Sequence, residues 1–179
     1  MKKITFFIPL FLLVLVLIGA GCGENGISSY SIYTSEEHQF SFEYPSSWYL
    51  EDNPEFSTIF LSNKEEEPPM GGVSLGARIE IFISENTQEL SLQEWIEWHK
   101  SQSGSEKEAL ETKQITVGNQ QAIRETVAVP EGAIAQGDPV TVYFSIDGDM
   151  VQMNYTGREP DYSENIEVFQ HLLNSFKFE

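Results

Sequence analysis

The chain has 179 residues with 28 acidic and ten basic side chains, which gives a formal net charge of −18 at pH 7. This acidic excess argues against nucleic acid as a partner, because a polyanion would be repelled. Apolar residues make up 40% of the chain and aromatic residues 12%, too many for a disordered chain and enough for the core of one domain.

The first 21 residues have the pattern of a secretory signal peptide. Lys2 and Lys3 precede an apolar run from Ile4 to Ala20, which ends in small residues. The alternative is a retained membrane anchor, but the run is just short of the roughly 20 residues that span a bilayer. We therefore predict export and cleavage. Loss of both lysines with the peptide would leave 158 residues, 28 acidic and eight basic, with a formal charge of −20.

Cys22 is the only cysteine, and it directly follows Gly19, Ala20 and Gly21. This arrangement resembles the bacterial lipobox, in which cleavage occurs before a cysteine that becomes acylated. The lipobox usually has a branched residue three positions before the cysteine, where this chain has Gly19. A lone cysteine forms no internal disulfide, and a thioether bond to lipid would remove an exposed thiol. We predict that Cys22 anchors the protein to the cell membrane on its extracytoplasmic face, since two or more acyl chains anchor stably.

A short tether is predicted between the anchor and the folded part. Residues 23–29, GENGISS, are polar and rich in glycine, and a flexible segment of this length reaches about 15 Å. The predicted organisation is therefore a signal peptide at 1–21, a tether at 22–29 and a single domain at 30–179.

Alternating apolar and polar residues predict a hairpin over 30–44, interrupted at 34–37. Pro45 should end the second strand and turn Trp48 back over the sheet. The further elements of this half are strands at 57–62 and 77–84, separated by a charged loop at 63–72 that is rich in proline and glycine.

A helix is predicted to begin at Ser91. Ser91 and Glu94 have the spacing of a capping box, and Leu90 and Trp95 that of a hydrophobic staple. The apolar face at helical spacing consists of Leu92, Trp95, Ile96 and His99.

Two hairpins and a helix are predicted in the second half. Gly118-Asn119 should form a type II′ turn between 113–117 and 121–128, and Asp147-Gly148 a type I′ turn between 140–146 and 150–156. The last helix should run from Ser163 to residue 175, with Phe176 and Phe178 holding the end of the chain. Because hairpins give antiparallel neighbours, the elements predict an α+β fold, an antiparallel sheet with helices on its faces.

Both ends of the domain resemble the PsbP-like superfamily, which includes a Ran-binding nuclear-transport factor and lipoproteins of the LpqN type. The residues that carry the resemblance are Tyr33-Thr34, Phe40, Phe42, Tyr44-Pro45, Trp48 and Ser175-Phe176-Lys177-Phe178. The resemblance implies an α/β/α sandwich around an antiparallel sheet. It also implies a non-enzymatic role in assembly or in binding a protein partner. The motif residues are core aromatics, so they indicate fold rather than a site.

The sequence offers little catalytic chemistry. The three histidines, His38, His99 and His171, are not at metal-ligand spacing, and no nucleophile elbow or phosphate-binding loop occurs. His99 and His171 are expected to be hydrogen-bonded imidazoles at the core edge. Asp147-Gly148-Asp149 lacks the rest of a calcium loop, and Glu94 is better explained by capping than by pairing with Glu97. We therefore predict no catalytic, cofactor-binding or metal-binding residue.

Trp98 lies beside the apolar helix face, where residues 101–112 could cover it or a partner could contact it. The sequence thus predicts a lipid-anchored binding or assembly module for an envelope or membrane protein. Two alternatives stay open, an acidic lipoprotein that binds divalent cations and a hydrolase with an unrecognised site.

Overall fold

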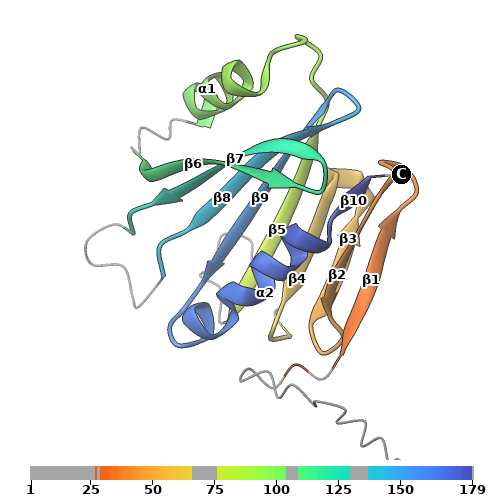
Figure 1. The fold of residues 1–179 in the computed structure, drawn as a ribbon, viewed down its shortest axis with the longest axis vertical. Coiled ribbons are helices and arrows are strands. Elements are labelled where there is room, and N and C mark those ends of the chain that lie inside the picture. Colours follow the sequence, from red (N-terminus) through yellow and green to blue (C-terminus); the bar gives the residue numbers. More distant parts are fainter. Residues whose placement is uncertain (1–26, 28, 66–75, 104–108, 130–136, 179) are drawn as a thin grey trace, which may run out of the picture.

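The computed structural model describes residues 27, 29–65, 76–103, 109–129 and 137–178 (Figure 1). The predicted signal peptide at 1–21 and Cys22 lie outside these residues, and the predicted tether is described only at Ile27 and Ser29. Ile27 packs against the main core, and the Ser29 carbonyl accepts a hydrogen bond of 3.0 Å from the N–H of Ser46. Within the described ranges, no helix has the length and apolarity needed to cross a membrane.

The described strands form two antiparallel sheets. The larger has the order β3-β4-β5-β9-β8-β7-β6 and the smaller the order β1-β2-β10. The strands are β1 (Tyr30–Ser35), β2 (Phe40–Pro45), β3 (Tyr49–Asn53), β4 (Thr58–Ser62), β5 (Ala77–Ser84), β6 (Ala109–Val117), β7 (Gln120–Val127), β8 (Val140–Ile146), β9 (Asp149–Gly157) and β10 (Lys177–Phe178). A short 3-10 helix, η1 (Pro54–Phe56), joins β3 to β4.

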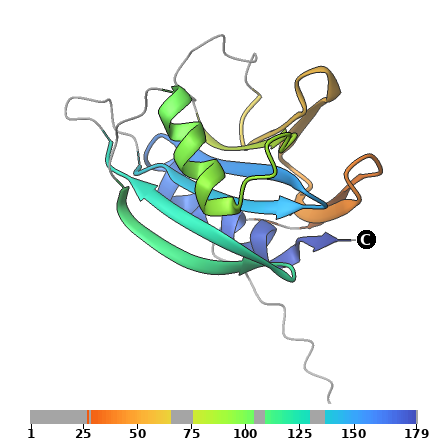
Figure 2. The same ribbon diagram turned by 90° about the horizontal axis from the view of Figure 1, so that it is seen from above.

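The two helices, α1 (Leu92–Ser103) and α2 (Asp161–Ser175), lie on opposite faces of the larger sheet (Figure 2). Alternate residues of one strand show this, because neighbours in a strand point to opposite faces. Val142 and Phe144 of β8 belong to the core that contains α2, whereas Tyr143 packs in a second cluster with Trp95 of α1. The predicted α+β class with antiparallel strands and flanking helices is therefore confirmed.

Aromatic rings join the smaller sheet to the rest of the main core. Phe176, which follows α2, has its ring 5.0 Å from Phe40 and 5.8 Å from Phe42 of β2, measured between centroids. It also meets Phe144 of the larger sheet edge-on at 5.4 Å. Trp48 is buried in the same core. The aromatic residues of the PsbP-like motif at both chain ends thus pack together, as expected of core residues.

Local sequence signals correctly predicted several elements. Ser91 and Glu94 form the reciprocal capping box, with the Ser91 N–H 2.9 Å from Glu94 Oε2 and the Glu94 N–H 3.4 Å from Ser91 Oγ. Asp147 and Gly148 both have positive φ, as a type I′ turn requires. At the other hairpin only Gly118 has positive φ, which fits the predicted order of a type II′ turn.

The predicted start of the last helix was wrong. The last helix begins at Asp161 rather than Ser163, and Ser163 does not cap it because its hydroxyl donates to Glu159 Oε1 at 2.7 Å. The Tyr162 N–H already bonds the Arg158 carbonyl at 2.8 Å. Strand β3 was missed, and the separate three-stranded sheet was not foreseen.

Candidate binding site

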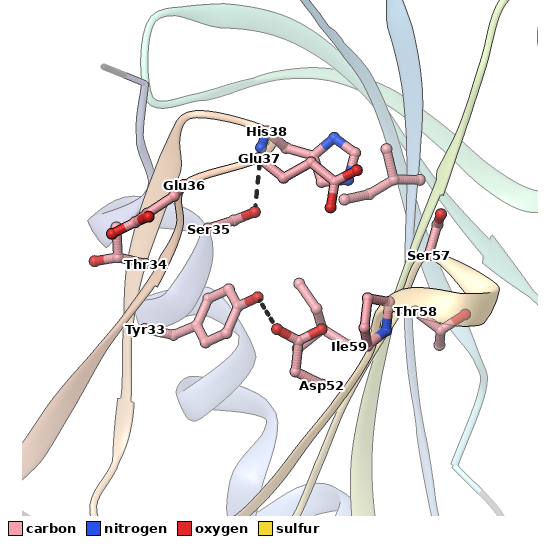
Figure 3. Close-up of a pocket in the computed structure, with 12 residues that line it drawn as sticks. Tyr33, Thr34, Ser35, Glu36, Glu37, His38, Asp52, Ser57, Thr58 and Ile59 are labelled. Atoms are coloured by element: carbon pink, nitrogen blue, oxygen red, sulfur yellow. Dashed lines mark hydrogen bonds between the residues drawn. The ribbon is translucent and has the colours of Figure 1, made fainter.

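A pocket of about 140 Å³ lies at the seam between the two sheets (Figure 3). One wall is the turn between β1 and β2, and the other comes from β3, η1 and the start of β4. The lining includes three carboxylates, those of Glu36, Glu37 and Asp52. Among the described residues that line this seam pocket, none is a lysine or arginine. The pocket therefore presents negative charge to solvent.

Turn geometry places these side chains. In the β1–β2 turn, Gln39 has a left-handed φ of 52°, and the backbone N–H of His38 bonds Ser35 Oγ at 3.3 Å. On the opposite wall, Ser57 has a φ of 47° and donates its N–H to the Pro54 carbonyl at 3.3 Å. The N–H of Ile83 then bonds the Ser57 carbonyl at 3.0 Å. Both turns are held by the chain itself, so the pocket walls are preformed.

A hydrogen bond from Tyr33 to Asp52 crosses the seam. The phenol donates to Asp52 Oδ2 at 2.6 Å, which joins β1 of the smaller sheet to β3 of the larger one. Burial and then the bond to the Asp52 carboxylate raise the pKa of Tyr33 above its ordinary value. The phenol therefore stays protonated at neutral pH and acts as a donor, not as a base.

The side chains of the seam pocket set the chemistry that it can offer. Nucleophilic catalysis needs a hydroxyl or thiol within hydrogen-bond reach of a base. In the described parts of the chain no Ser, Thr or Tyr hydroxyl bonds a histidine ring. Nor do the described residues contain a group of three or more His, Cys, Asp or Glu side chains placed to hold a metal ion. What the pocket offers is carboxylate oxygens to a cationic or hydrogen-bond-donating group.

The β3–η1–β4 hairpin exposes two large aromatic side chains. Phe56 of η1 is 70% exposed, and Tyr49 of β3 is 48% exposed. Sequence reasoning missed both, because it placed no strand at 49–53. The Asn53-Pro54 pair was the available signal, since Asn-Pro favours the start of a turn.

The three histidines lie in separate parts of the fold, the β1–β2 turn, α1 and α2. His38 lines the seam pocket. His99 lies at a core edge, as expected, where it stacks on Trp95 with ring centroids 4.8 Å apart and burial lowers the pKa of its imidazole. The hydrogen bond expected for its ring is not found among the described residues. His171 is more exposed than expected, with Nε2 2.9 Å from Glu43 Oε2.

The other residues singled out in the sequence do not line the seam pocket; they are Trp98, Glu94, Glu97 and Asp147. Trp98 is 40% exposed, so the described residues leave part of it open to solvent, and residues 104–108 of its expected cover lie outside the description. Glu94 caps α1, whereas Glu97 accepts a bond of 3.0 Å from the Gln93 amide, so the two carboxylates do not pair with each other. Asp147 belongs to the β8–β9 turn.

No protein-family profile and no curated protein sequence matches the chain. Solved structures match its fold. The solution structure of the cyanobacterial PsbP (CyanoP) from Synechocystis sp. PCC 6803 superposes with a TM-score of 0.59 at 15% identity. The match covers 88% of this chain and 97% of that protein.

Two further matches have a TM-score of 0.55. The Ran-binding protein Mog1p of Saccharomyces cerevisiae is 12% identical over 84% of this chain and 95% of its own. A protein from Bacteroides thetaiotaomicron is 9% identical over 83% of this chain, and the match spans about half (48%) of that longer protein. Identities this low show a shared fold alone, so the chain has a PsbP-like fold.

Proposed function

We propose that the protein is a lipid-anchored extracytoplasmic module that binds an envelope or membrane protein and catalyses no reaction. The observation that carries the binding role is the pair of exposed aromatics on the β3–η1–β4 hairpin, Phe56 and Tyr49. Aromatic side chains supply much of the binding energy at protein interfaces.

The shared fold supports a binding role without assigning it. The yeast protein that shares the fold is named for binding Ran, itself a protein. A fold hosts many functions, so the proposal depends on this chain's own surface. That surface has an acidic pocket, lined by the carboxylates of Glu36, Glu37 and Asp52.

The anchor is proposed from the amino-terminal sequence. Acyl chains on Cys22 would hold the domain at the membrane after removal of residues 1–21. An acidic domain gains nothing from an anionic bilayer surface, so a covalent tether is needed to keep it there. Because Ile27 already packs on the core, few residues separate Cys22 from the folded domain. The partner would therefore be found close to the membrane.

Crosslinking in the native host tests the binding role. Cells that produce the full-length chain with a carboxyl-terminal tag are treated with formaldehyde, and the tagged complexes are isolated from solubilised envelopes. We expect one envelope or membrane protein to be enriched at least tenfold over the same isolation from an untagged strain. Enrichment of none under several growth conditions would argue against a partner-binding module.

A further inference from the structure

We propose that the partner docks on a groove across β3, β4 and β5 and places a basic side chain against Glu51. The β3–β4 groove, as we name it, consists of two adjoining depressions of about 190 and 280 Å³ that share Glu51 and Phe60. The inference rests on the proposed function, because it names the surface and the chemistry of the partner.

Strand register sets the layout of the groove. Glu51 of β3 pairs with Phe60 of β4, and Phe60 pairs with Glu80 of β5, so these three side chains form one row across the sheet. Ile59 and Ile81, the strand neighbours of Phe60 and Glu80, point into the main core. The row therefore faces the opposite side of the sheet, the side on which α1 lies.

Helix α1 covers only the other half of this face. Its cluster contains Tyr143 of β8, Met150 of β9 and Ile123 of β7, and no described residue of β3, β4 or β5 belongs to it. Figure 2 shows α1 displaced from the β3–β4 end of the sheet. In the described part of the chain, the groove is therefore uncovered by either helix.

Exposed aromatic rings stand at the two ends of the groove. Tyr49 lines one depression and Phe56 the other. The five residues of β3, from Tyr49 to Asn53, span about 13 Å, four steps of roughly 3.3 Å each, and Phe56 follows in η1. An extended segment of four or five partner residues would reach from one ring to the other, so the groove fits a strand-like peptide segment.

The charge of the groove favours a basic partner. Arg78 lies 4.2 Å over the Phe60 ring and is paired with Glu80, and Lys64 is paired with Asp161, so both nearby cations are already neutralised. Among the ion pairs of the described residues, none includes Glu51, which lies exposed where the two depressions of the groove meet. A lysine or arginine of the partner would supply the missing charge.

A second copy of this chain is a poor occupant. The net charge of −18 makes two copies repel, and Lys64, Lys100, Lys113 and Arg124 are already held in ion pairs within the chain. Opposite charge, in contrast, steers association and fixes the orientation of a basic partner. The partner is thus a basic protein segment flanked by apolar side chains that meet Tyr49 and Phe56.

Photocrosslinking in the native host locates the surface. Benzoylphenylalanine is placed in the full-length chain at position 49 or 56, and at 98 or 110 as matched controls, since Trp98 and Leu110 are exposed apolar residues outside the groove. We expect the protein captured by formaldehyde to crosslink from 49 and 56 only. Crosslinks to it from 98 or 110 and none from the groove would overturn the groove and leave the binding role standing. No crosslink from any position, with no protein captured by formaldehyde, would overturn both.

Charge reversal tests the chemistry with the crosslinked protein in purified form. We expect Glu51→Lys to weaken binding at least tenfold and Glu51→Gln about threefold, with a smaller salt dependence, because salt screens the attraction between an exposed carboxylate and a basic side chain. Glu97→Lys on α1, an equal change of charge on an exposed residue, should change the affinity less than twofold. Equal effects of the Glu51 and Glu97 reversals would show that only net charge matters and would contradict docking at Glu51.

Discussion

Replacing Phe176 by alanine should lower the free energy of unfolding by about 3–5 kcal/mol, the usual cost of removing a buried aromatic side chain. Phe176 is almost fully buried and contacts rings from both sheets, at 5.0 Å from Phe40 and 5.4 Å from Phe144. The loss of stability has two causes. Apolar area is no longer buried, and a cavity is left between β2, β8 and β10, whose rings contact Phe176. Urea unfolding followed by tryptophan fluorescence measures the change.

Phe56→Ala is the matched control for this substitution. It removes the same side chain at a position that is 70% exposed, so stability should change by about 0.5 kcal/mol or less. A cost below about 1 kcal/mol for Phe176→Ala would mean that this residue does not join the two sheets. The contrast also separates the core role of the motif aromatics from the binding role proposed for Phe56.

Replacing Cys22 by serine should release the mature chain from sedimented envelopes, with at least a tenfold fall in the bound fraction. Serine has no thiol to form the thioether, and each buried CH₂ of an acyl chain contributes about 0.8 kcal/mol to membrane binding. Cell fractionation with immunodetection of the chain measures the change.

Asn25→Ser is the control for the anchor, because it alters the same polar segment and retains Cys22. This variant should sediment with envelopes as the wild type does. Equal retention of Cys22→Ser and wild type would show that something other than lipid on this sulfur holds the protein.

Elements set by neighbouring residues could be predicted from the sequence. The Asp147-Gly148 turn needs two residues that tolerate positive φ, and both sit at adjacent positions. The capping box of α1 depends on Ser91 and Glu94, one helical turn apart. In each case the interaction that determines the structure lies within a few residues, so the pattern is visible in the sequence.

Elements set by distant residues could not be predicted. The N–H of Glu43 in β2 bonds Ser175 Oγ from the end of α2, across 132 positions of sequence. Strand β3 exposes most of its side chains and lacks a clear alternation, so nothing local marks it. The candidate site could not be predicted for the same reason, because Glu37 and Asp52 line one pocket only when the two sheets are packed together.

The PsbP-like resemblance indicated the fold because its residues are the core. Phe40, Phe42, Trp48 and Phe176 are all buried. The β3–β4 groove, by contrast, is lined by Tyr49, Phe56 and Glu51, none of which belongs to the motif. Proteins that share this core can therefore differ in what they bind, and partner identity depends on surface residues of each chain.

The most direct test of a membrane-tethered domain is intact-mass spectrometry of the protein isolated from the envelope of its native host. We predict a polypeptide that begins at Cys22 and carries the added mass of a diacylglyceryl group, with or without a further acyl chain on the amino group. A chain that still begins at Met1, or one that begins elsewhere with an unmodified Cys22, would contradict lipid anchoring and the location proposed from it.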